Sequence, residues 1–515
     1  MTHLRLLSAA TIVLVAALVV HVAEAQPLAQ RKAVQALTAS ELLSLRRGVK
    51  QMMDWNDAPR DSANYRRSWI YWANMHQYFG EDCMCWSNAN GGLIPCSELR
   101  ANGMTSDPIP PNLPGLERVI TWTQMNPIEM ATWCKAEHRN DLFLPWHRLY
   151  LWYFEQVLQA AAGDPALRLP YWDYATDSFV PAAYRDATYV NAAGQTMPNP
   201  LRVEERALAL NAGLTGLDRG VVSAAVAMQA TSYSMFNSAL EDIPHGTVHC
   251  ALGVAGCDTG LMGSVPVSPL DPIFHAHHTN IDRLYDCWLR ANEAARQLRD
   301  QTLLNRTYTF VARDGSPTPL VRVGDRLLSS QLGYAYTACP AAAAVAAVAG
   351  AAGGGTGSEA TPTDVASAPR VALAGLTQLE PGGTIVPITV PLAAPAGGRV
   401  YVVIEGLSVD VVPRALYNVY LADDDGRREQ IGVTSFFHFT MPQDGAHAGH
   451  APSTGRYTFD ATEAVQQLSL AEAAQPALVF EPTTGLMDSE PAAAAARISP
   501  QANVRFDNAW LVRIP

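Results

Sequence analysis

Residues 271–285 read DPIFHAHHTNIDRLY, a histidine-rich stretch that opens a segment with helical spacing of its apolar residues. Shortly before it, His245 and His249 form an HxxxH pair, which on a helix places two imidazoles one turn apart on one face. A helix that begins at the start of the 271–285 stretch would point His278 at the same metal ion. Asp282 follows His278 by four residues on the same helical face, so we expect its carboxylate to orient a ligand imidazole.

A second group of candidate ligands comes earlier in the chain. His147 lies near the start of an aromatic-rich segment, residues 142–162, which has helical spacing and is followed by Gly163, a residue typical of helix ends. His138 lies in the loop that enters this helix. Between the N-terminal segment and His138 the remaining histidine is His76, so a third protein ligand in this group would be His76. Imidazole is a ligand that suits copper.

Four motifs in order resemble the tyrosinase and polyphenol oxidase family, whose members are type-3 copper proteins related to molluscan haemocyanin. They are FLPWHRLY at 143–150, LPYWD at 169–173, EDIPHGTVH at 241–249, and the stretch at 271–285. The resemblance covers roughly residues 65–295 and extends more loosely to the C-terminal part. Four specific motifs in the right order make a chance match improbable.

The resemblance implies two copper ions with three histidine ligands each, and O2 as co-substrate. The first copper would be held by His76, His138 and His147, and the second by His245, His249 and His278. In the family the second histidine of the His-His pair is the ligand, so His277 would be a neighbour of the metal and not a ligand.

Four further positions take expected roles from the resemblance. Phe274 matches the aromatic gate that stacks over the substrate ring, and Glu241 matches an acidic residue that positions a water near the coppers. Gly246 stands where many hydroxylating members have an Asn that helps the glutamate activate this water, which favours catechol oxidation here. His275 replaces an aromatic residue that is usual in the family. We interpret it as a modifier of the substrate pocket, with a core or surface histidine as the alternative.

The implied function is a dicopper oxidase that uses O2 to oxidise catechols to o-quinones, with ortho-hydroxylation of monophenols left open. The expected partners are a small phenolic or catecholic substrate and O2. An o-aminophenol oxidase belongs to the same class. A haemocyanin-like oxygen carrier would have the same six histidines without turnover, but a signal peptide and a single site favour the enzyme. A zinc-dependent hydrolase with HxxxH would leave the other three motifs unexplained.

Composition changes along the chain predict four parts. Residues 1–25 have an apolar run followed by Ala-Glu-Ala, which predicts a signal peptide and a secreted or periplasmic protein, with a retained anchor as the alternative. Residues 26–339 predict a mainly α catalytic domain, a four-helix-bundle dicopper core with long loops. Residues 340–369 are an Ala/Gly-rich linker. Residues 370–515 contain short β-branched runs, which predict an all-β sandwich or barrel.

The resemblance also gives the β domain a role. In longer family members a C-terminal domain covers the copper site and inserts a side chain into the pocket, and residues 432–439, GVTSFFHF, are our candidate for this contact. The formal net charge of the 515-residue chain is -12, which argues against nucleic acid and anionic membranes as main partners. Eight cysteines predict disulfide bonds of an exported protein.

Overall fold

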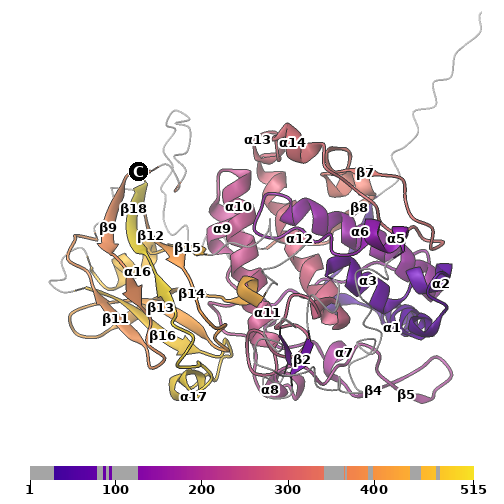
Figure 1. The fold of residues 1–515 in the computed structure, drawn as a ribbon, viewed down its shortest axis with the longest axis horizontal. Coiled ribbons are helices and arrows are strands. Elements are labelled where there is room, and N and C mark those ends of the chain that lie inside the picture. The colour runs from indigo at the N-terminus through magenta and orange to yellow at the C-terminus, as the bar shows by residue number, and fades with distance from the viewer. Residues whose placement is uncertain are drawn as a thin grey trace, which may run out of the picture.

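The computed structural model describes residues 28–77, 85–87, 92–94, 126–340, 365, 368–392, 398–440, 454–470 and 476–514. The predicted signal peptide at 1–25 and most of the predicted linker at 340–369 lie outside these residues. A helical region and a C-terminal β region lie side by side (Figure 1). The predicted fold class, a mainly α domain followed by an all-β domain, is confirmed. Among the described helices, none has the length and apolar character needed to cross a membrane.

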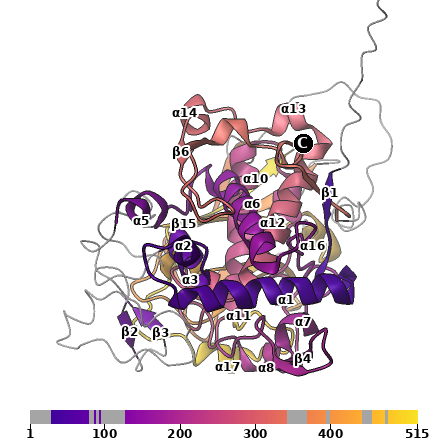
Figure 2. The ribbon, with the colours of Figure 1, turned by 90° about the vertical axis from the view of Figure 1, so that its right-hand side faces the viewer.

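Two long helices, α6 (Phe143–Ala162) and α12 (Ile273–Ala291), pack against each other in the centre of the helical region. The helix α1 (Ala39–Asp54) runs along α6 and crosses the front of the molecule in Figure 2. The remaining helices are α2 (Ala63–Arg66), α3 (Trp69–His76), α5 (Pro127–Thr132), α7 (Ala182–Arg185), α8 (Leu208–Asn211), α9 (Ala225–Gln229), α10 (Tyr233–Leu240), α11 (Thr247–Leu252), α13 (Glu293–Arg296) and α14 (Gln301–Leu304).

The ends of the two long helices follow from local sequence. Helix α6 accepts Pro145 in its first turn, where no helical hydrogen bond is lost, and ends at Gly163 with a left-handed φ of 64°. This agrees closely with the predicted helix at 142–162. Helix α12 ends at Ala291, because Asn292 leaves the helical conformation.

The C-terminal region contains two four-stranded sheets with antiparallel pairing, β11-β16-β13-β14 and β15-β12-β18-β9. Val402 and Val419, one from each sheet, are fully buried in the same hydrophobic core, as expected for a sandwich. The strands are β9 (Arg370–Ala374), β11 (Thr384–Pro387), β12 (Arg399–Leu407), β13 (Leu416–Ala422), β14 (Arg428–Thr434), β15 (Gly455–Asp460), β16 (Ala477–Thr483) and β18 (Asn508–Ile514). The helices α16 (Thr462–Gln467) and α17 (Pro491–Ala495) and the pair β10 (Thr377–Gln378) and β17 (Arg505–Phe506) complete the region.

The two ends of the helical region meet in a short parallel pair, β1 (Ala29–Arg31) with β8 (Tyr334–Tyr336). The hairpins β2 (Cys85–Ser87) with β3 (Gly92–Ile94), β4 (Thr188–Val190) with β5 (Thr196–Pro198), and β6 (Thr307–Tyr308) with β7 (Val321–Arg322) lie elsewhere in this region. Two disulfide bonds occur among the described residues, Cys250–Cys257 and Cys287–Cys339. The second one ties α12 to the chain that follows β8.

Asp282 organises this junction and does not orient an imidazole, which corrects our expectation. Its carboxylate accepts hydrogen bonds from Arg148 Nε at 2.5 Å and from the hydroxyls of Tyr334, at 2.6 Å, and Tyr336. Arg31 Nη1 lies 3.4 Å away. Burial alone would raise the pKa of Asp282, but the neighbouring guanidinium groups hold it below its usual value. The carboxylate therefore neutralises two buried arginines and joins α6 and α12 to both ends of the region.

His275 lies in an aromatic core, which is the alternative that we left open beside a pocket modifier. Its ring stacks on Phe154 with centroids 3.8 Å apart and lies 5.0 Å from the ring of Trp69. Successive residues on a helix point about 100° apart, so His275 packs on Trp69 and Phe154 while its neighbour Phe274 points towards the histidine rings of His76 and His278. Burial lowers the pKa of His275 to about 3, so the imidazole is neutral.

The substitution Asp282→Asn tests the role of the carboxylate. It keeps the shape of the side chain but leaves Arg148 and Arg31 buried without a full counter-charge, so we expect a loss of about 3–5 kcal/mol in the free energy of unfolding. Urea denaturation of the metal-free protein measures it. As a control, Asp54→Asn removes an exposed pair with Lys50 and should cost less than about 0.5 kcal/mol. If Asp282→Asn also lowers the free energy of unfolding by less than about 0.5 kcal/mol, the role of Asp282 as the counter-charge of the two buried arginines is contradicted.

The substitution His275→Phe should reduce the acid sensitivity of the protein. Because the pKa of His275 is about 3 in the folded state and near 6.5 in the unfolded state, its stabilising contribution is full above pH 6.5 and is lost as the pH falls. Between pH 7 and pH 4.5 this amounts to about 2.5 kcal/mol. Urea titrations of the metal-free protein at both pH values should show that the free energy of unfolding falls less between pH 7 and pH 4.5 in the variant than in the unmodified protein. If the free energy of unfolding falls equally in the variant and in the unmodified protein, His275 takes up a proton in the folded state.

Candidate metal centre

Two groups of buried histidines meet in the middle of the helical region. One group contains His76, His138 and His147, and the other contains His245, His249, His277 and His278. Within each group the potential ligand nitrogens lie within 4.8 Å of one another. All six histidines that we expected to bind copper are therefore brought together in the expected two groups, and His277 joins the second.

The first group is placed by two helices and by the segment that directly precedes the second helix. His76 is the last residue of α3, His147 lies in the first turns of α6, and His138 lies in the segment that leads into α6. The ring centroids of His76 and His138 are 5.0 Å apart, and those of His138 and His147 are 5.1 Å apart. The three rings thus surround one small volume.

The second group is placed by a kinked helical segment and by α12. His245 belongs to η5 (Glu241–Gly246), in which Ile243 leaves the helical conformation with φ -139° and ψ 123°, and His249 lies in α11. The HxxxH pair still brings its rings within 4.7 Å, one helical turn apart. His278 comes from α12, with its ring 5.0 Å from that of His245 and 5.6 Å from that of His249.

The two groups are in direct contact. The rings of His147 and His278 stack with centroids 4.6 Å apart and planes 13° apart, and the rings of His138 and His245 lie 6.2 Å apart. Two ions, one in each group, would therefore be close enough to share a small ligand between them.

Backbone carbonyls fix the orientation of the rings. Nδ1 of His147 lies 2.8 Å from the Phe143 carbonyl oxygen, Nδ1 of His245 lies 3.0 Å from that of Glu241, and Nδ1 of His249 lies 2.8 Å from that of Met262. An imidazole that donates its Nδ1–H to a carbonyl presents the lone pair of Nε2 to a metal. In agreement, Nε2 of both His147 and His245 is buried without a hydrogen bond.

These imidazoles are neutral. Burial lowers the pKa of His147 and of His277 to about 3, and it lowers the pKa of His76, His245, His249 and His278 well below the usual value. Neutral imidazole is the form that binds metal ions. Buried nitrogens without partners, in an all-imidazole donor set, are what a copper site requires.

His277 remains an open choice within the second group. Its ring lies 4.9 Å from that of His249 and 5.6 Å from that of His245, and both of its nitrogens are buried without a hydrogen bond. Its distances to the neighbouring rings are therefore similar to those of His278. The role of His278 as ligand and His277 as neighbour stays a prediction.

Glu241 and Gly246 lie at the mouth of the site. Both line a cavity of about 10 Å³, together with His138 and His245. Oε1 of Glu241 accepts a hydrogen bond from the backbone N–H of Arg139 at 2.7 Å. Burial raises the pKa of Glu241 to about 8, although the nearby arginine opposes the shift. The carboxyl group is therefore mostly protonated at pH 7 and half protonated near pH 8.

The β region closes this mouth. Phe437, from η9 (Phe437–Thr440), stacks on His249 with ring centroids 4.0 Å apart and planes 10° apart, and lies 5.6 Å from His245. Ser435 lies beside Gly246, where an added Cβ would be 3.0 Å from its Oγ. Both residues belong to the segment 432–439, which we expected to contact the site.

Phe274 is not over the cavity, which corrects its expected position as a gate. It is fully buried between His278, at a centroid distance of 4.1 Å, and His76, at 5.3 Å. Val265 and Phe437 line the cavity instead. The sequence contained a signal for Phe437, the aromatic run in 432–439, but Val265 lies in an irregular loop without any motif of its own.

Comparisons with known proteins agree with this geometry. Residues 66–215 and 207–291 match the family model described as the common central domain of tyrosinase. Catechol oxidase B, chloroplastic, of Solanum tuberosum is 28% identical over 233 residues, which cover 39% of this chain and 39% of that protein. A tyrosinase of Hahella sp. (strain CCB-MM4) is 29% identical over 239 residues, which cover 41% of this chain and 49% of that protein. The match thus spans less than half the length of either relative.

Solved structures extend the likeness to the whole fold. A recombinantly expressed latent aurone synthase (polyphenol oxidase) superposes over 95% of this chain and 90% of its own, with a TM-score of 0.56 and 15% sequence identity. At that identity the superposition concerns the fold alone, a helical core with a C-terminal β domain. With the matched central domain and the two histidine groups, it follows that the chain belongs to the tyrosinase and polyphenol oxidase family.

Proposed function

We propose that this protein is a copper-dependent oxidoreductase that uses O2 to oxidise catechols to o-quinones. The observation that carries the proposal is the contact between two groups of buried, neutral imidazoles, with His147 stacked on His278. A pair of copper ions held there would pass electrons from catechol to O2, so that two catechols are oxidised for each O2 reduced to water. The two disulfides and the predicted signal peptide support a secreted or periplasmic enzyme.

The protein's own groups would orient the reactants and handle protons. The first copper would be held by His76, His138 and His147, and the second by His245, His249 and His278. Glu241, with a pKa of about 8, would exchange a proton with a water or a substrate hydroxyl near neutral pH. Gly246 offers no side-chain amide to assist it, so we propose catechol oxidation as the main reaction and slower hydroxylation of monophenols.

We propose further that the full chain is latent. The cavity at the site, about 10 Å³, has room for about one water molecule and none for a phenol ring. Phe437 occupies the position over His249 that a substrate ring would need. The β region would therefore have to move away, or be removed by cleavage in the predicted linker at 340–369, before a substrate could enter.

An oxygen carrier is the second candidate. The same closed cavity favours it, because a site that only binds O2 needs no access for a phenol. An o-aminophenol oxidase would be a variant of the main proposal, since its substrate has the shape of a catechol. Turnover by a protein with an opened site separates these possibilities.

The substitution Phe437→Ala should open the site in the full chain. We expect the copper-loaded variant to consume O2 with 4-methylcatechol at least about tenfold faster than the unmodified chain, because the stacked ring no longer fills the substrate position. With p-cresol the rate should stay well below that with the catechol. The control Phe439→Ala removes a ring whose contacts are with Phe436 and His438, and should leave the rate unchanged. Reversible O2 binding by the variant, without turnover of either compound, would favour the carrier.

Copper content distinguishes the two adjacent histidines of α12. After loading with copper and gel filtration, the unmodified chain should hold two copper ions per molecule, His278→Ala should hold about one, and His277→Ala should retain two. Elemental analysis gives the stoichiometry. The reverse result would make His277 the ligand, and a single zinc ion in all three proteins would contradict the dicopper proposal.

A further inference from the structure

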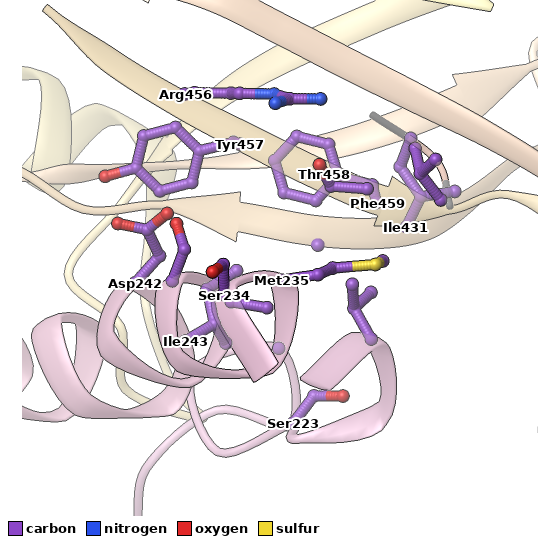
Figure 3. Close-up of a pocket in the computed structure, with 16 residues that line it drawn as sticks. Ser223, Ser234, Met235, Asp242, Ile243, Ile431, Arg456, Tyr457, Thr458 and Phe459 are labelled. Atoms are coloured by element: carbon purple, nitrogen blue, oxygen red, sulfur yellow. The ribbon is translucent and has the colours of Figure 1, made fainter. Parts of the chain in front are cut away.

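A second, larger cavity lies between the helical region and the β region, close to the candidate metal centre. It measures about 220 Å³. One wall comes from α9, α10 and η5, and the other from β14 and β15. Figure 3 shows Met235 and Ile243 on the helical side opposite Tyr457 and Phe459 on the strands. Because each region supplies one wall, the cavity exists only while the β region is seated.

The lining is mainly apolar and has two charged groups, the guanidinium of Arg456 and the carboxylate of Asp242, which pairs with Arg139. Met235, Ile243, Ile431 and Phe459 provide the apolar surface, and Arg456 provides the cation. A cavity smaller than those that take drug-sized ligands, with this lining, fits a single ring or a short alkyl chain that carries one polar group.

Arg456 has hydrogen-bond donors to spare. Its Nε lies 3.4 Å from Oε1 of Glu405 but is buried without a hydrogen bond. The same oxygen lies 2.7 Å from Nη1 of Arg370, and the other oxygen of Glu405 accepts from the indole N–H of Trp510 at 2.9 Å. The carboxylate of Glu405 is thus shared by the guanidinium groups of Arg370 and Arg456 and also accepts a hydrogen bond from Trp510. Arg456 therefore keeps positive charge and N–H donors that a second carboxylate could bind.

The cavity wall is joined to the segment that closes the metal centre. The hydroxyl of Tyr457 donates to the carbonyl oxygen of Ser435 and accepts from its backbone N–H at 3.2 Å. The Oγ of Ser435 in turn accepts from the backbone N–H of Phe437 at 3.2 Å. A ligand that holds the two walls together therefore also holds Phe437 over His249.

We propose that this interdomain cavity binds a small amphipathic carboxylate, with its carboxylate on Arg456 and its ring or alkyl chain between Met235 and Phe459. Such a ligand bridges both walls, so it binds the closed chain and opposes opening of the metal centre. At ten times its dissociation constant it lowers the open population by about 11-fold. The regulatory part rests on the cap assigned in the proposed function, but the binding site does not depend on copper or on turnover.

Calorimetric titration of the metal-free full chain tests the site, with 3-phenylpropanoate as the probe. We expect one molecule to bind per chain, and Arg456→Gln to weaken the binding at least about tenfold because a charge-assisted hydrogen bond is lost. Ser238→Trp should abolish binding, since Ser238 is an exposed lining residue and the indole would fill the cavity. The alcohol 3-phenylpropan-1-ol, which has the same ring without the charge, should bind at least about tenfold more weakly.

The matched control is Arg505→Gln. The side chain of Arg505 is 40% exposed, close to the 39% of Arg456, and it pairs with Asp410 away from the cavity. This variant should bind 3-phenylpropanoate like the unmodified chain. Equal binding by Arg456→Gln, by Ser238→Trp or by the alcohol would overturn the site, as would the absence of binding at millimolar concentration.

Amide hydrogen exchange tests the regulatory part in the same metal-free protein. With 3-phenylpropanoate at ten times its dissociation constant for the unmodified chain, exchange in residues 435–438 should slow by about 11-fold in that chain and by no more than about twofold in Arg456→Gln. Binding that leaves this exchange unchanged would overturn the regulatory part. Because no copper or catechol is present, failure here is distinct from failure of the proposed oxidase activity.

Discussion

The structure depends on keeping a group of imidazoles neutral, buried and pointed at one another. Burial opposes protonation of these rings, and backbone carbonyls take up the Nδ1 hydrogens of His147, His245 and His249. Nε2 of His147 and of His245 then has no protein partner, which is costly in a buried site unless a metal accepts the lone pair, and Nε2 of His249 lies 3.4 Å from Nε2 of His278. The same arrangement that is costly without a metal creates two adjacent binding sites for one.

The scaffold around these rings is held by charge as well as by packing. Asp282, one helical turn beyond His278, binds Arg148, which follows His147 in α6. The carboxylate of Asp282 therefore joins α6 and α12, the two helices whose histidines stack on each other. Through Arg31 it also holds the start of the helical region. The β region adds a closing contact at Phe437, so access to the site depends on how firmly the two regions are held together.

Local patterns in the sequence were enough to predict the helix at 142–162 and the HxxxH pair, because spacing decides which residues share a helical face. The full set of six candidate ligands, His76 included, was implied by the resemblance to the tyrosinase and polyphenol oxidase family. Local patterns also predicted the end of α6 at Gly163. Contacts between distant segments could not be predicted. Asp282 finds Arg31, Tyr334 and Tyr336 across the fold, His275 faces an aromatic core, and the cavity at Arg456 forms only where two regions meet. Such contacts are set by tertiary packing, and the spacing of residues within one helix does not predict which distant segments come together.

Anomalous diffraction at the copper absorption edge, from crystals of the copper-loaded full chain, is the most direct measurement of the central claim. We expect two peaks, one enclosed by the rings of His76, His138 and His147 and the other by those of His245, His249 and His278. A single peak, or a signal at the zinc edge alone, would contradict a paired copper centre.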